Sequence, residues 1–138
     1  MEMSQMFTEQ KWNIIKCLSQ EHLSPLQLSE KLDSTMANIS QQLKLLEAAN
    51  LVHKRKIKNR DKGKPRSLFS LTDDFVFLVP AMNNFAGKKL LKATNHHKIM
   101  LRIWFLKNEL LHYPLEKLYW RLEKSFDSIE AILVDEVK

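Results

Sequence analysis

Apolar residues recur every three or four positions in three stretches near the start of the chain, which predicts three helices that each bury one face. The first helix would follow the cap residue Thr8. The second would follow Ser24, because the proline after it suits a first helical position. Asp33 or Ser34 would cap the third, a candidate recognition helix over about residues 35–49. The apolar positions are Trp12, Ile14, Ile15 and Leu18, then Leu26, Leu28 and Leu32, then Met36, Ile39, Leu43 and Leu46.

The period changes to two after Leu51. Residues 52–58 alternate as VHKRKIK, and a second run, residues 67–71, follows a polar stretch. This pattern predicts a two-stranded β-hairpin over about residues 52–70. The run FVFLVP at residues 75–80 fits either a strand or a buried helical turn, because it is too short and too apolar to show a period.

The last third of the chain returns to a helical period. One helix is predicted over about residues 95–111, with Pro114 ending it and beginning the next. The final IEAILVDE (129–136) fits a strand as well as a helix. The two apolar stripes are Ile99, Ile103, Leu106 and Leu110, then Leu115, Leu118, Leu122, Phe126, Ile129 and Leu133.

One short segment determines the net charge of +6. Eight of the thirteen residues from Lys54 to Arg66 are basic, and residues 51–66 together have a net charge of +7. Such a run also fits a solvated loop or an unfolded RNA-binding tail, but the apolar residues on both sides favour a folded hairpin. Positive charge concentrated in this way suits a polyanion. The basic residues are Lys54, Arg55, Lys56, Lys58, Arg60, Lys62, Lys64 and Arg66.

Composition narrows the function classes further. A single cysteine, Cys17, excludes an internal disulfide and a CxxC site. Two glycines leave no room for a phosphate-cradling loop. No catalytic triad or carboxylate pair follows from the spacing, so we expect no enzyme activity and no cofactor. The N-terminus does not resemble a signal peptide and the apolar runs are too short to span a bilayer, so we expect a cytoplasmic protein without membrane contact.

Three helices followed by a basic hairpin is the order of a winged helix-turn-helix. The segment STMANISQQLKLLEAANLV (34–52) resembles the recognition helix of ArsR- and MarR-type bacterial and archaeal regulators. Asn50 stands where glycine is usual, and Asn is the next best residue for a left-handed helix end. The resemblance covers about residues 8–72 and implies a prokaryotic DNA-binding transcription regulator. The matching positions are Ser40, Gln41 and Gln42 at the polar centre, Leu43 and Leu46 at the packing positions, and Leu51–Val52 at the exit.

We therefore predict a mainly α fold. A winged helix-turn-helix domain, three helices plus a two-stranded β-wing, would occupy residues 1–72, and a C-terminal helical extension residues 73–138. The wide apolar faces of the extension indicate an oligomerisation element, and we expect a homodimer. The candidate dimer contacts are Ile99, Ile103, Leu106, Leu110, Leu118, Leu122 and Phe126.

On double-stranded DNA, the third helix would lie in the major groove and the wing on the backbone or in the minor groove. Amide and hydroxyl side chains can pair with base edges, whereas Lys and Arg hold phosphates. We expect a repressor that occupies a promoter. The candidate base contacts are Thr35, Asn38, Ser40, Gln41 and Gln42. The candidate backbone contacts are Lys44, Lys54, Arg55, Lys56, Lys58, Arg60, Lys62, Lys64 and Arg66.

Two other functions stay open. A winged helix can act as an adaptor that binds protein or RNA within a larger assembly. A metal- or metabolite-gated repressor is the third hypothesis. Adjacent His96 and His97 point apart on a helix, and Pro114 interrupts the helix that would align His112 with Glu116. We therefore predict no metal site, and the remaining option is a site shared across a dimer by His96 or His97 with Glu109.

Overall fold

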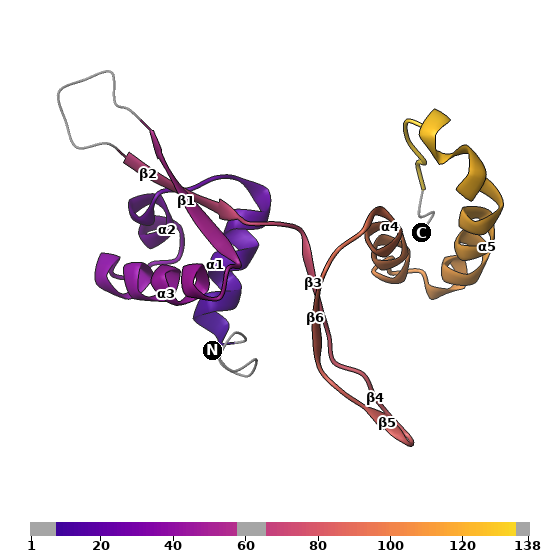
Figure 1. Ribbon diagram of the computed structural model, residues 1–138, viewed down its shortest axis with the longest axis horizontal. Helices are drawn as coiled ribbons and strands as arrows, with labels where there is room; N and C mark the ends of the chain where they lie inside the picture. The colour runs from indigo at the N-terminus through magenta and orange to yellow at the C-terminus, as the bar shows by residue number, and fades with distance from the viewer. Residues whose placement is uncertain (1–7, 58–65, 135–138) are drawn as a thin grey trace. The chain divides into compact units, whose positions relative to one another are not determined.

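The computed structural model describes residues 8–57 and 66–134, and the chain divides into two compact units, Met1–Asp74 and Phe75–Lys138. The described elements of the first unit are α1 (Glu9–Gln20), α2 (Pro25–Lys31), α3 (Met36–Ala48), β1 (Val52–Ile57) and β2 (Arg66–Leu71) (Figure 1). Those of the second are β3 (Phe75–Leu78), β4 (Ala81–Met82), β5 (Phe85–Ala86), β6 (Lys89–Lys92), α4 (Asn95–Trp104), η2 (Glu109–Leu111), α5 (His112–Leu122) and η3 (Glu123–Ser128), where η marks a 3-10 helix.

The first unit is a winged helix-turn-helix. Helix α3 packs against α1, α2 and β1, and β1 pairs antiparallel with β2 to form the wing. Leu23, between α1 and α2, exchanges backbone hydrogen bonds of 3.1 and 2.8 Å with Phe69 of β2. The wing is thereby joined to the helices through the backbone as well as through the core. The core consists of Ile14, Ile15, Leu18, Leu23, Leu28, Ile39, Leu43, Leu46, Leu51, Val52 and Phe69.

Local hydrogen bonds explain where α2 begins. The backbone N–H of Gln27 donates to Ser24 Oγ at 3.2 Å, and the backbone N–H of Ser24 donates to Gln27 Oε1 at 2.9 Å. With Pro25 in the first turn, this reciprocal capping box confirms the predicted start. Asn50 has a φ of 58°, which confirms the predicted left-handed end of α3. Thr8 stands at the predicted position before α1, but its side chain makes no capping hydrogen bond.

Two predictions for the first unit were wrong in detail. Thr35, rather than Asp33 or Ser34, caps α3: its hydroxyl oxygen accepts a hydrogen bond from the backbone N–H of Asn38 at 3.2 Å. Three apolar side chains predicted to be buried are exposed. Two of them lie about 100° around their helices from the buried face, and the third lies in the first turn of α3. These residues are Trp12, Leu26 and Met36.

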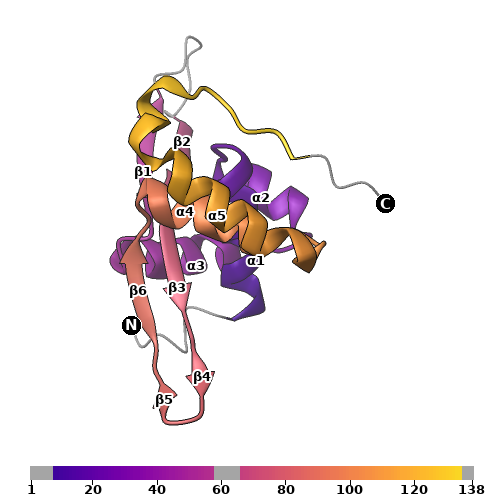
Figure 2. The ribbon, with the colours of Figure 1, turned by 90° about the vertical axis from the view of Figure 1, so that its right-hand side faces the viewer.

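The second unit begins with a β-ribbon that the predicted helical extension did not include. β3 pairs with β6 and β4 pairs with β5, both antiparallel (Figure 2). The start of the run FVFLVP is therefore a strand and not a helical turn. A two-residue turn, Asn83–Asn84, joins β4 to β5, and Asn84 adopts a φ of 64°, which Asn tolerates better than most residues.

The predicted helix over residues 95–111 ends earlier, at Trp104. Asn108 begins the separate helix η2 by accepting a hydrogen bond from the Leu110 amide at 3.1 Å, a local bond that competes with a continuous α-helix. Helix α5 starts before Pro114 and ends at Leu122. Residues 129–134 form neither helix nor strand, so the extension of this helix to Leu133 was wrong.

A small core joins α4 to α5. The His96 Nδ1 and the Tyr119 hydroxyl form a hydrogen bond of 2.8 Å between the two helices. The Trp104 indole N–H donates to the Glu116 carboxylate. Many large apolar side chains of this unit nevertheless remain exposed. The core consists of the buried residues Met100, Ile103 and Tyr119, with Ile99 and Leu115 packed against them.

The orientation of α3 can be tested by stability measurements. Leu43→Ala should lower the free energy of unfolding by about 2–5 kcal/mol, because Leu43 is 1% exposed and its truncation leaves a cavity. Leu45→Ala is the control on the same helix. Leu45 is 39% exposed, so its loss should cost less than about 1 kcal/mol. Urea denaturation followed by circular dichroism measures both, and equal losses would contradict the orientation.

Candidate nucleic-acid interface

Helix α3 presents one polar face outside the core. Its buried residues, Ile39, Leu43 and Leu46, occupy one side of the helix. At 100° per residue, the opposite side contains Ala37, Gln41, Lys44 and Ala48, all of which are exposed. Leu45 at the edge of this face is also exposed. The face therefore combines an amide, an ammonium group and two methyl groups within reach of a partner.

The other predicted base contacts lie nearer to the helix-turn-helix turn. Thr35 is exposed, but its hydroxyl caps α3. Asn38 is half-buried, and its Nδ2 donates to Ser34 Oγ at 2.9 Å. Ser40 is half-buried at the flank of the helix. Of the five predicted residues, Gln41 is therefore the one whose side chain lies fully on the outward face.

Gln42 lies toward the interior instead. Its Oε1 is buried and has no hydrogen-bond partner within the described part of the chain. The side chain lines a polar cavity of about 140 Å3 together with Gln10 and Asn13 of α1 and with Asp33 and Asn38. An unpaired buried acceptor costs about 1–3 kcal/mol unless water fills the cavity.

The wing presents basic side chains on both faces. Register pairs Lys54 with Phe69 and Arg55 with Leu68, so neighbouring basic residues of β1 lie on opposite faces of the hairpin. Lys56 and, on β2, Arg66 are exposed as well. Lys58, Arg60, Lys62 and Lys64 lie outside the described residues.

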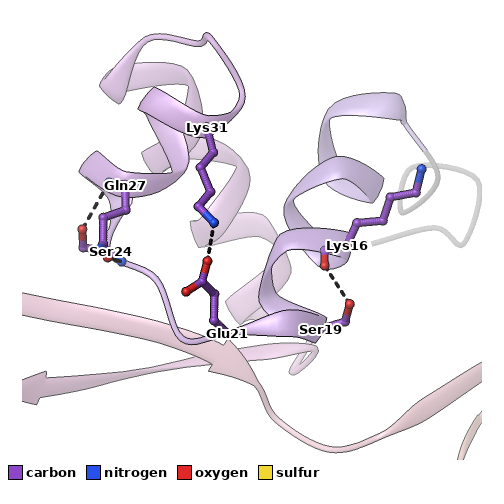
Figure 3. A network of polar contacts seen from close by, with 6 residues as sticks. All are labelled: Lys16, Ser19, Glu21, Ser24, Gln27 and Lys31. Atoms are coloured by element: carbon purple, nitrogen blue, oxygen red, sulfur yellow. Dashed lines mark hydrogen bonds and ion pairs between the residues drawn. The ribbon is translucent and has the colours of Figure 1, made fainter.

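Lys31, by contrast, has its charge paired. Its ammonium group donates to the Glu21 carboxylate, which joins α2 to the residue that follows α1 (Figure 3). This hydrogen bond and the attraction of the opposite charge raise the pKa of Lys31 above its ordinary value. The Ser24–Gln27 capping box lies beside it. These contacts stabilise α2 and the segment between α1 and α2. Lys31 is not among the candidate phosphate contacts.

The candidate dimer contacts differ in exposure. Ile103 is buried in the core of its own unit, whereas Leu110 and Leu118 are exposed. Ile99, Leu106 and Leu122 are half-buried. The side chain of Phe126 lies outside the described residues. The second unit also contains a cavity of about 610 Å3 between α4, α5 and residues 129–134.

The part of the chain that the structure describes has neither a metal-binding cluster nor a membrane-spanning helix. Residues 8–57 and 66–134 contain no cluster of three or more His, Cys, Asp and Glu side chains placed to bind a metal ion. His97 Nδ1 accepts a hydrogen bond from the Thr94 amide at 3.1 Å in the capping box of α4. Within the same described ranges, the structure has no helix with the length and apolar character needed to span a bilayer.

Sequence reasoning missed Ala37 as a member of the outward face. The signal was available, because Ala37 is four residues before Gln41 and seven before Lys44, which places all three on one side of a helix. Ala37 was missed because only polar side chains were considered as base contacts. Its methyl group can nevertheless contact the methyl group of thymine.

One comparison with known proteins agrees with the fold of the first unit. A family model described as a helix-turn-helix domain matches residues 13–55. A structure of reduced HlyU from Vibrio cholerae is 26% identical, with a TM-score of 0.43, over 49% of this chain and 65% of that chain, less than two thirds of its length. A search of the curated proteins found no match.

Two further solved structures are similar at lower identity. One, described as a structure of prokaryotic transcription factors, is 17% identical with a TM-score of 0.39, over 93% of this chain and 86% of the other. The ferric uptake regulator of Francisella tularensis with iron is 16% identical with a TM-score of 0.42, over 98% of this chain and 88% of the other. All three TM-scores are below 0.5.

The inward position of Gln42 leads to a stability prediction. Gln42→Met removes the unpaired acceptor at similar volume and should raise the free energy of unfolding by about 1 kcal/mol. Gln41→Met changes an exposed side chain and should alter it by less than about 0.5 kcal/mol. Urea denaturation compares the two variants. A loss of stability in Gln42→Met would mean that a bound water satisfies Oε1.

Proposed function

We propose that the protein is a sequence-specific double-stranded DNA-binding transcriptional regulator that acts as a homodimeric repressor. The main support is the exposed polar face of α3 in the same compact unit as a basic wing. A helix fits the major groove, where each base pair presents a distinct pattern of hydrogen-bond groups. The proposed activity is binding, with no catalytic step.

In this proposal, the outward face of α3 reads the bases. The Gln41 amide can pair with an adenine edge, and the Ala37 methyl group can pack against a thymine methyl group. Lys44 lies on the same face and can contact either a guanine edge or a phosphate. Thr35 and Ser40 remain candidates at the edges of the contact. Asn38 and Gln42 also remain candidates, but each would first have to turn away from its position between the helices.

The wing would supply affinity without sequence preference. Its basic residues lie on both faces of the hairpin, and Arg55 is on the face away from the buried Val52 and Phe69. Each neutralised phosphate releases counterions, and about five contacts per protomer would give a log–log salt slope of about −4.5. The five described candidates are Lys44, Lys54, Arg55, Lys56 and Arg66.

The exposed apolar surface of the second unit supports the proposed homodimer. Leu110 and Leu118, two of the predicted dimer contacts, are exposed together with Trp104, Phe105 and Trp120. A surface of this kind usually marks an interaction site, and a two-fold dimer buries the same patch on both subunits. Two recognition helices would then meet half-sites about one helical turn apart.

A pair of variants tests the division between bases and backbone. Gln41→Ala should reduce discrimination between the preferred duplex and a scrambled one by about 1–3 kcal/mol, with non-specific affinity retained. Neutralising Lys54, Arg55 and Lys56 with Gln should weaken binding to every duplex and flatten the salt slope by about 2.7 per protomer. Fluorescence anisotropy over a salt series measures both effects, and Lys16→Gln, an exposed lysine on α1, is the charge control.

The same titrations separate the proposal from its alternatives. Equal effects of the Gln41 and wing variants on all duplexes would contradict base reading by α3. No binding to any duplex at low salt, with co-purification of a protein or RNA partner, would favour the adaptor function. Release of a bound duplex on addition of a metal ion or metabolite would favour a gated repressor.

A further inference from the structure

The β-ribbon of the second unit is one continuous structure. The β3–β6 and β4–β5 pairs share a single register. Between them the Gly87 amide donates to the Pro80 carbonyl at 3.1 Å, in the same register. Residues 75–92 therefore form one antiparallel ribbon, which ends in the turn Asn83–Asn84. Figure 2 shows β4 and β5 at the end of the ribbon away from α4.

The tip of this ribbon exposes two large apolar side chains. Met82 and Phe85 are direct partners in the register and are 62% and 58% exposed. Directly opposed residues of an antiparallel pair project from the same face, so the two side chains lie side by side. We call these two side chains, together with the Asn83–Asn84 turn that joins them, the apolar tip.

The charged residues near the tip are basic, and the acids nearest to the ribbon in the sequence, Asp73 and Asp74, precede its other end. From Phe75 to Asn108 the chain contains six Lys or Arg and no Asp or Glu. Lys88 and Lys89, both exposed, follow the tip after Ala86 and Gly87, and alternation places Lys89 on the face of the apolar tip and Lys88 on the other. Two ribbons packed tip to tip would bring the like charges of Lys88 and Lys89 in the two copies together. A polyanion is the partner that this charge fits.

We propose that the apolar tip inserts between base pairs from the minor groove of duplex DNA and bends it, with Lys88 and Lys89 on the flanking phosphates. The inference rests on the proposed function, that this protein binds duplex DNA. Met and Phe are among the wedges that unstack base steps from the minor groove, where Asn side chains can bond the base edges. The unstacked step kinks the duplex by about 20–90°.

The experiment measures bending directly. The probe is a duplex of about 20 base pairs with a central TA step, because such steps are easily kinked, and with donor and acceptor dyes at its ends. On binding, the wild-type protein should raise the energy transfer between the ends. Met82→Ala/Phe85→Ala should bind about tenfold more weakly and leave the transfer unchanged. Tyr113→Ala, which removes a 64% exposed aromatic side chain outside both the ribbon and the proposed dimer surface, should behave as wild type.

A second variant keeps the tip intact. Lys88→Gln/Lys89→Gln should flatten the log–log salt slope by about 1.8 per protomer while the bound DNA remains bent. A 2-aminopurine base at the central step gives an independent signal. Its fluorescence should rise on unstacking by the wild-type protein, by Lys88→Gln/Lys89→Gln and by Tyr113→Ala, and should not rise with Met82→Ala/Phe85→Ala. Circular dichroism confirms that each variant is folded.

Each contrary outcome has a distinct meaning. Binding of the wild-type protein without bending would overturn the wedge and leave the proposed function standing. If neither the wild-type protein nor any variant binds duplex DNA at low salt, both the wedge and the proposed function are wrong. If the tip variant still bends DNA but sediments as a smaller species, the tip contacts a second copy. If it instead loses binding to phosphatidylserine vesicles, the tip contacts a membrane, and either result overturns the wedge.

Discussion

The burial of Ile39, Leu43 and Leu46 sets the rotation of α3 about its own axis. These three side chains lie against the core that α1, α2 and β1 complete, so the helix cannot turn without exposing them to water. One consequence is that Gln41 and Lys44 lie on the outward face. The other is that Gln42, one residue further along, lies beside the core with its oxygen unpaired. The candidate contact surface therefore depends on the apolar packing behind it.

The contacts around α3 hold it in that position. The Thr35 hydroxyl caps its first turn, and Asn50 ends it in a left-handed conformation that directs the chain into β1. Leu23, between α1 and α2, forms backbone hydrogen bonds with Phe69 of the wing, and the Glu21–Lys31 ion pair links α2 to the end of α1. The first unit thus places a polar helix face and a basic hairpin in one scaffold. In our proposal, the helix supplies specificity and the wing supplies most of the affinity.

Prediction from sequence succeeded where the signal was local and strong. The Ser24–Pro25 start of α2, the left-handed Asn50 and the burial of Ile39, Leu43 and Leu46 all follow from capping chemistry or helical period. The β-ribbon was missed because none of its strands alternates: β3 is apolar on both faces, β4 and β5 have two residues each, and β6 is KLLK. Its turn, Asn83–Asn84, was the available signal. The inward orientation of Gln42 follows from the same period, because Gln42 lies three residues after Ile39 and four before Leu46. The cavity beside it was not predictable, because Gln10 and Asn13 of α1, far away in the sequence, line it.

In vitro selection of random duplex DNA on the purified protein, at near-physiological salt, tests the central claim most directly. A dimeric reader of bases should recover an inverted repeat whose half-sites are centred about 10 base pairs apart. Gln41→Ala should then lose preference at one position of each half-site. Salt-sensitive binding to every sequence, with no enrichment, would contradict sequence recognition by α3 and leave a non-specific DNA-binding protein.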